Sequence, residues 1–83
     1  MHMMLITTDR KLALGARLSG MATEQVDEVH PANEAWHEAL DDPELGALFV
    51  SGELAEELSE EIATLRERES LPLVYVLPAE KEE

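Results

Sequence analysis

Cysteine is absent from the chain, and aromatic residues are scarce, with one Trp, one Tyr and one Phe. The missing cysteines exclude disulfide bridges and thiolate metal sites. No apolar run approaches the ~20 residues that a membrane-spanning helix needs, so we expect no direct membrane insertion. Residues 1–4 have neither the basic start nor the apolar core of a secretory signal peptide. We interpret residues 1–3 as a cloning remnant or a disordered start.

Basic residues are also few, with six Lys and Arg against 19 Asp and Glu and a net charge of −13. Residues 1–20 hold Asp9 against Arg10, Lys11 and Arg17, so the rest of the chain carries −15. Nucleic acid is not an expected partner, because phosphate contacts need clustered Lys and Arg, and neither is an anionic membrane surface. A basic protein surface would complement the acidic part. The alternative is that the acids only keep a small domain soluble.

Apolar and amphipathic segments alternate along the 83 residues, which is a length for one domain. Strands are expected at Met4–Thr8, Thr23–Val29, Leu45–Val50 and Leu71–Leu77, and helices at Arg10–Ser19, Pro31–Leu40 and Ser51–Arg68. This alternation predicts right-handed crossovers and a parallel sheet. We therefore expect a single α/β domain over residues 4–78, with an acidic tail at 79–83.

Capping residues mark the ends of the expected helices. Asp9 stands at an N-cap position, Gly20 is a C-terminal stop, and Pro31 fits a first helical turn. Ser51 is expected to cap a long third helix. The third helix is the clearest, because one continuous apolar stripe runs along it: Leu54, Leu58, Ile62 and Leu65.

The run from Leu71 to Pro78 is apolar, rich in branched side chains and bounded by prolines. Such a run is typical of a strand buried on both faces, as in parallel sheets with helices on either side. Only five residues follow Pro78. We expect the second face of the sheet to be underfilled, and the isolated chain to self-associate or to be weakly stable.

Phosphate-binding motifs are not formed. Residues 15–20 contain two glycines at the spacing of a P-loop, but Met21 and Ala22 follow in place of Lys and Ser or Thr. These glycines end a helix and do not open one, so no cradle of backbone amides is expected. The dinucleotide pattern G-x-G-x-x-G is absent.

Other chemistries also lack their residues. A phosphoreceiver needs an acceptor carboxylate after the third strand, and Ser51 and Gly52 stand there instead. His30 stands directly before Pro31, and His37 follows seven residues after His30. This is not the H-E-x-x-H spacing of a zinc site. Trp36 belongs to an apolar helical stripe, which indicates core packing. With no nucleophile, base and oxyanion site in reach, we expect no catalytic residue, no metal ligand, no cofactor and no enzyme activity.

Two segments in the right order resemble the F subunit of the V-type and archaeal A-type rotary ATPases. The first runs from Leu5-Ile6-Thr7-Thr8-Asp9 to Gly15-Ala16-Arg17-Leu18-Ser19-Gly20. The second runs from Leu48-Phe49-Val50-Ser51-Gly52-Glu53-Leu54-Ala55-Glu56 to Leu71-Pro72-Leu73-Val74-Tyr75-Val76-Leu77-Pro78. The resemblance covers about residues 4–79. The chain departs from the family at Ala16, where Phe is usual, and in lacking the C-terminal helix that follows the final Pro.

This resemblance implies a non-catalytic central-stalk (rotor) subunit that binds the coiled coil of the D subunit. It also implies a flavodoxin- or receiver-like winding with strand order 2-1-3-4 and helices on both faces. The protein would be cytoplasmic, peripheral to the membrane, and part of a complex that couples ATP to proton or sodium transport. The alternative function is a receiver-like signalling or protein-interaction domain without a phospho-acceptor.

The first helix bears on where a partner would bind. Its apolar residues spread around more of the helix than the ~100° stripe of a one-sided surface helix. Leu14 and Leu18 therefore either border an unfilled groove or partner face, or reach the sheet with the others. We expect partner contacts at Leu14, Arg17, Leu18, Tyr75 and Pro78, and self-association through the uncovered sheet face.

Overall fold

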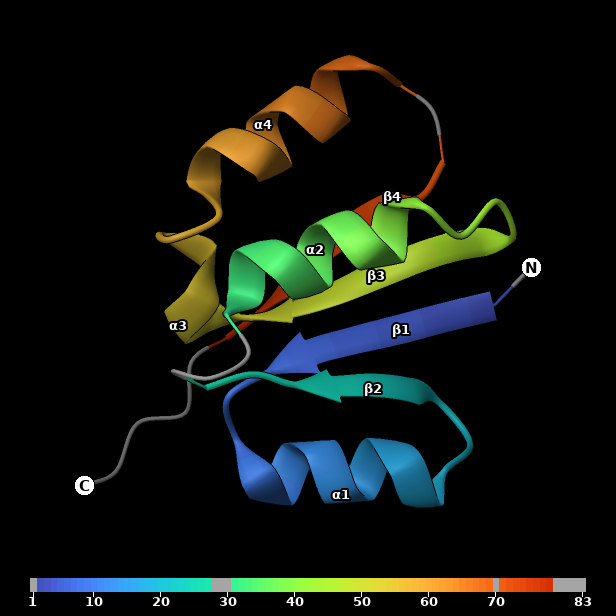
Figure 1. Ribbon diagram of the computed structural model, residues 1–83, viewed down its shortest axis with the longest axis vertical. Helices are drawn as coiled ribbons and strands as arrows, with labels where there is room; N and C mark the ends of the chain where they lie inside the picture. The colour runs from blue at the N-terminus through green and yellow to red at the C-terminus, as the bar shows by residue number, and fades with distance from the viewer. Residues whose placement is uncertain (1, 28–30, 70, 79–83) are drawn as a thin grey trace.

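Four parallel strands form one sheet in the computed structural model, which describes residues 2–27, 31–69 and 71–78 (Figure 1). The elements in chain order are β1 (His2–Thr7), α1 (Arg10–Leu18), β2 (Ala22–Gln25), α2 (Ala32–Leu40), β3 (Leu45–Ser51), α3 (Gly52–Ala55), α4 (Ser59–Glu67) and β4 (Leu73–Leu77). The strand order is β2-β1-β3-β4, and every pairing is parallel. The α/β class, the parallel sheet and the 2-1-3-4 order are confirmed.

The observed strand boundaries differ from the expected ones at the start of β1 and at the end of β2. β1 begins at His2, which pairs with Leu45 of β3, so residues 2 and 3 belong to the sheet. β2 is shorter than expected and ends at Gln25, although Val26 beyond it is buried. It lies at a sheet edge, as its polarity predicts. The rest of its expected range, at residues 28 and 29, lies outside the described residues, as does the tail at 79–83.

Both ends of α1 are formed as predicted. The Asp9 side chain caps the helix by accepting from the backbone N–H groups of Lys11 (2.9 Å) and Leu12 (3.2 Å). At the other end Gly20 has φ +92°, the left-handed conformation that glycine adopts without strain. The N–H of Gly20 donates to Arg17 and that of Met21 to Ala16, which is the Schellman arrangement.

The core lies between the sheet and a layer made of α2, α3 and α4 (Figure 1). Trp36 of α2 is 1% exposed and packs there, so its assignment to the core is confirmed. Pro31 stands at the N-cap of α2, one position before the first helical residue. The apolar stripe of the third predicted helix also enters this core: Leu54, Leu58, Ile62 and Leu65.

The long helix expected from Ser51 to Arg68 is wrong in its continuity. It is divided into α3 and α4 by a turn at residues 56–58. The N–H of Leu58 still donates to Leu54, but that of Ser59 donates to Glu56, three residues back. Ser51 does not cap α3, because its side chain makes no bond to a helix N–H.

The other face of the sheet is half covered. α1 is the described helix on that side, and it packs over β1 and β2 (Figure 1). Among the described residues the second face of β4 is thus underfilled, as expected, although the composition of the run is typical of a strand buried on both faces. Val74 is 8% exposed, whereas Leu73 and Tyr75 on the opposite face are 53% and 47% exposed. The strip of sheet formed by β3 and β4 lies open on the α1 side.

Candidate interaction surfaces

A groove runs between α1 and the uncovered part of the sheet, and we call it the α1-side groove. Its volume is about 390 Å³. Its lining residues are Leu5, Lys11, Leu12, Gly15, Ala16, Ser19, Met21, Phe49 and Leu77. Gly15 and Ala16 belong to the helical wall, whereas Leu5, Phe49 and Leu77 form the floor. The small residues of the wall and the apolar floor suit a second apolar element laid beside α1.

Beyond the groove the uncovered strip continues across β4. The Phe49 and Tyr75 rings stack with their centroids 5.2 Å apart and their planes 21° from parallel. Leu73, Tyr75 and Leu77 alternate along β4 and share the face of Phe49. We call Phe49, Leu73, Tyr75 and Leu77 the open strip. It is an exposed apolar patch of the kind that marks interaction surfaces.

A second apolar surface lies on α1 itself. Leu14 is 57% exposed and Leu18 is 79% exposed, while the sheet-facing residues Ala13 and Ala16 are buried. Leu14 and Leu18 thus point away from their own sheet, and we call them the outer face of α1. Neither residue lines the α1-side groove; Leu12 does. Leu14 and Leu18 therefore do not reach the sheet, which was one of the two interpretations that the sequence allowed.

The remaining predicted contact residues lie at the borders of these surfaces. Arg17 is exposed on α1 between Leu14 and Leu18 in sequence, and Pro78 is exposed directly after β4. Tyr75 belongs to the open strip. The five predicted residues thus form two surfaces, not a single patch. Leu12, Phe49 and Leu73 also lie on these surfaces but were not predicted, because the exposure of a strand or helix face depends on what packs over it.

The carboxyl ends of the strands carry a cleft of about 410 Å³ lined by Asp9, Lys11, Leu12, Ser51, Glu53, Leu77 and Pro78. Ligands of open α/β sheets bind at this edge. Asp9 is engaged as the cap of α1, and Glu53 Oε1 accepts from the hydroxyl of Thr8 at 2.8 Å. The cleft therefore combines two carboxylates and one ammonium group with an apolar wall.

Ser51 occupies the position where a phosphoreceiver has its acceptor carboxylate. It is 3% exposed, and its hydroxyl donates to Thr7 Oγ1, which is itself fully buried. Thr7 Oγ1 also accepts from the backbone N–H of Asp9 at 3.0 Å. The hydroxyl pair joins the ends of β1 and β3, so the structural role of Ser51 is to tie these two strands together.

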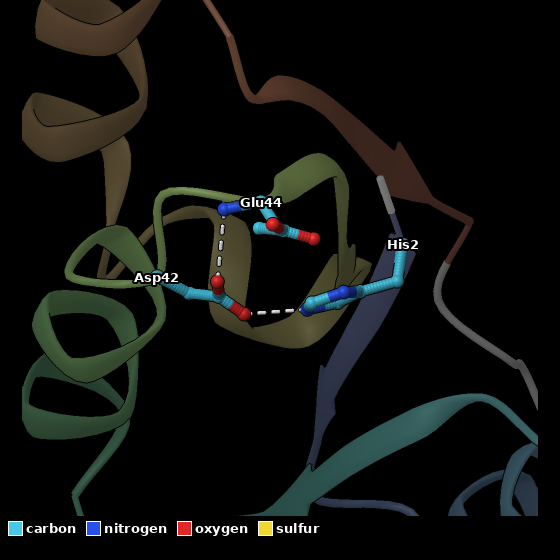
Figure 2. A network of polar contacts seen from close by, with 3 residues as sticks. All are labelled: His2, Asp42 and Glu44. Carbon is cyan, nitrogen blue, oxygen red and sulfur yellow. Dashed lines mark hydrogen bonds and ion pairs between the residues drawn. The ribbon is translucent and has the colours of Figure 1, made fainter.

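At the amino ends of β1 and β3, three residues form a polar network that the sequence did not indicate (Figure 2). Asp42 reaches from the loop after α2 toward His2 at the start of β1, and its Oδ2 lies 2.5 Å from His2 Nε2. Its Oδ1 accepts from the backbone N–H of Glu44 at 2.9 Å. This backbone hydrogen bond, followed by the bond and charge of His2, holds the pKa of Asp42 below its ordinary value. The network fastens the start of β1 to the loop before β3.

In the described part of the chain, no group of three or more His, Asp or Glu side chains is placed to hold a metal ion. His37 is exposed on α2, and His30 lies outside the described part of the chain. Among the described helices, none is long and apolar enough to cross a membrane.

A parallel sheet of strand order 2-1-3-4 with helices on both faces defines a small α/β domain of the flavodoxin-like winding. The family model of the ATP synthase (F/14-kDa) subunit matches residues 4–83. The chain belongs to this family, the F subunits of V-type ATP synthases, and is therefore related to the subunits of rotary ATPases. Searches of curated proteins and of solved structures gave no match.

Proposed function

We propose that this chain is a non-catalytic subunit of the central stalk (rotor) of a V- or A-type ATPase and binds the coiled coil of the D subunit. The family match over residues 4–83 carries this proposal. In this role the protein transmits rotation or regulates it, peripheral to the membrane, in a complex that couples ATP to proton or sodium transport. The reaction itself takes place on other subunits.

The exposed apolar surfaces support a role in binding. Leu14 and Leu18 on the outer face of α1, and Tyr75 on the open strip, present large side chains that a helix of the D subunit can cover. Arg17 and Pro78 border these surfaces, and Arg17 adds a cation that an acidic residue of the partner can pair with. We propose these five residues as the contact with the D subunit.

The receiver-like alternative has less support. The position after β3 holds Ser51, whose hydroxyl is engaged with Thr7 and buried. The family match favours the stalk over a signalling domain.

Co-purification with the D subunit tests the proposal. The chain and the D subunit encoded with it are expected to elute together in size-exclusion chromatography. Leu18→Glu is expected to weaken the complex about tenfold or more, because it places a charge in an apolar contact. Thr64→Glu adds the same charge on the exposed surface of α4 and should leave binding unchanged. Separate elution of the two wild-type chains would contradict the proposal.

A further inference from the structure

We propose that two copies of this chain pair face to face, each laying the outer face of its α1 on the open strip of the other. Within residues 2–27, 31–69 and 71–78, two apolar surfaces are uncovered on the same side of one sheet: Leu14 and Leu18 on α1, and the open strip on β3 and β4. A second copy supplies an outer face of α1 to cover the open strip, and an open strip to cover the outer face of α1. The inference concerns the chain by itself and goes beyond its place in the stalk.

The dimensions of the two surfaces agree. Neighbouring strands lie ~4.8 Å apart, so β3 and β4 together expose a strip about 10 Å wide, which is the width of one α-helix with its side chains. α1 has nine residues and is therefore about 14 Å long, and β4 with five residues spans about 17 Å. One helix of a second copy thus fills the strip next to the resident α1.

Of the two directions considered for the twofold axis, parallel to the strands and across them, one gives this arrangement. A twofold axis parallel to the strands, between two facing sheets, puts the α1 helix of each copy over β3 and β4 of the other. The two α1 helices then run parallel and side by side in a middle layer. A twofold axis across the strands would instead superimpose the two helices. The flank along which they meet is the wall of the α1-side groove, with Leu12, Gly15 and Ser19.

Gly15 makes a close approach of the two helices feasible. A Cβ placed on Gly15 would meet no atom within 4 Å, so the space beside this residue is open in the single chain. Interhelical distances of 8–10 Å depend on the side chains at the contact, and Gly15 and Ser19 are small. The twofold axis brings the Gly15 residues of the two copies near one another.

Charge distribution favours a second copy in spite of the net charge of −13. None of the 19 acidic residues lies within α1, β3 or β4, whereas α1 carries Arg10, Lys11 and Arg17. Arg10 at the start of α1 and Glu53, two residues after β3, both lie at the carboxyl ends of the strands. Parallel helices therefore bring Arg10 of each copy toward Glu53 of the other, where opposite charges attract. Much of the acidic surface, on α2, α3 and α4, faces away from the contact.

A single engineered cysteine tests the geometry, because the chain has none of its own. Gly15→Cys is expected to form disulfide-linked dimers readily under mild oxidation. Arg17→Cys lies on the same helix but on the flank away from the groove, and serves as the matched control. Several-fold faster cross-linking at residue 15 supports the proposal. Equal rates at the two positions, or no cross-linking at residue 15, would overturn it.

Sedimentation equilibrium of the full chain tests the association itself. The wild type is expected to dimerise reversibly, and both Leu18→Glu and Tyr75→Glu to raise the dissociation constant about tenfold or more. Thr64→Glu, on the opposite layer, is expected to match the wild type. Circular dichroism confirms that each variant is folded. A wild type that stays monomeric at the highest soluble concentration, or that associates unchanged in both variants, contradicts the proposal.

A mixture of the two variants gives a further check. Leu18→Glu spoils the outer face of α1 but leaves the open strip intact, and Tyr75→Glu does the reverse. A mixed pair therefore keeps one of the two contacts, whereas a pair of identical variants keeps neither. The mixture is expected to associate more tightly than either variant alone. If the mixture shows no gain, the reciprocal contact is wrong.

Discussion

Asp9 shows how one side chain sets the start of α1. Its carboxylate accepts from two backbone N–H groups that have no partner inside the helix. Asp9→Ala is expected to lower the free energy of unfolding by about 1 kcal/mol. Urea denaturation followed by circular dichroism measures this loss. Asp9→Asn keeps an accepting oxygen and should lose much less; equal losses in the two variants would show that capping is not the role of Asp9.

Asp42 makes the stability of the protein sensitive to acid. The bond from the backbone of Glu44 and the neighbouring His2 lower the pKa of Asp42 in the folded state relative to the unfolded state. The resulting stabilisation is present above the unfolded pKa and is lost as the pH falls through the folded pKa. Wild type and Asp42→Asn are therefore expected to differ most near neutral pH and to converge below about pH 4.

Denaturant unfolding of both proteins across this acidic range measures the effect. Asn keeps an oxygen that can accept from Glu44, so the comparison isolates the carboxylate charge. A difference between the two proteins that stays constant from about pH 6 to pH 3 would contradict the lowered pKa.

Local and distant contacts differ in what the sequence reveals about them. The cap at Asp9 could be predicted, because its acceptor and donors lie within three residues. The pair of His2 and Asp42 is 40 residues apart, and no local pattern marks it. Leu14 and Leu18 could be placed on a helix, but their exposure depends on the position of α1 over the sheet. The sequence alone therefore could not decide whether Leu14 and Leu18 border a groove or partner face or reach the sheet.

The division between α3 and α4 shows a limit of periodicity at the scale of an element. The stripe from Leu54 to Leu65 fits one uninterrupted helix, and all of its members are buried. At the turn of residues 56–58, the N–H of Ser59 donates to the carbonyl three residues back, not four. Leu58 nevertheless stays in the core. Because the burial pattern survives the turn, hydrophobic spacing could not reveal it.

Leu58 lies in this turn with its side chain fully buried. Leu58→Ala is expected to cost about 2–5 kcal/mol through lost burial and the cavity left behind, a large fraction of the stability of a small domain. Thermal and urea melts measure the loss. Leu18→Ala removes the same atoms from a side chain that is 79% exposed, and should change the stability of the folded single chain by less than about 0.5 kcal/mol. Similar losses at the two positions would show that Leu58 is not packed as described.

At the scale of the whole molecule, the alternation of elements predicted the parallel sheet, and the family resemblance supplied its strand order. The apolar run at Leu71–Pro78 correctly predicted a strand, but its composition alone does not show which faces are covered. Burial of both faces requires a covering element on each side, and composition reports only that a strand tolerates such burial. Among the described residues, the α1 side of β4 has no such cover.

An association that buries the open strip should couple stability to concentration. If the folded chain dimerises, the melting temperature is expected to rise as protein concentration is raised about a hundredfold, since mass action favours the folded dimer. Differential scanning calorimetry measures this shift. Leu18→Glu should melt at a temperature that hardly depends on concentration. If the melting temperature of the wild type also does not depend on protein concentration, the coupling is contradicted.

The central place of β1 has a consequence for how the chain is made. His2–Thr7 is synthesised before the other described strands, yet one of its two neighbours is Leu45–Ser51, about 40 residues later. Such non-local parallel pairing slows folding relative to helical proteins of the same size. While α1 can form as soon as its own residues emerge, β1 keeps one unpaired edge throughout the synthesis of the first half of the chain. The nascent protein is therefore most exposed to mispairing before β3 leaves the ribosome.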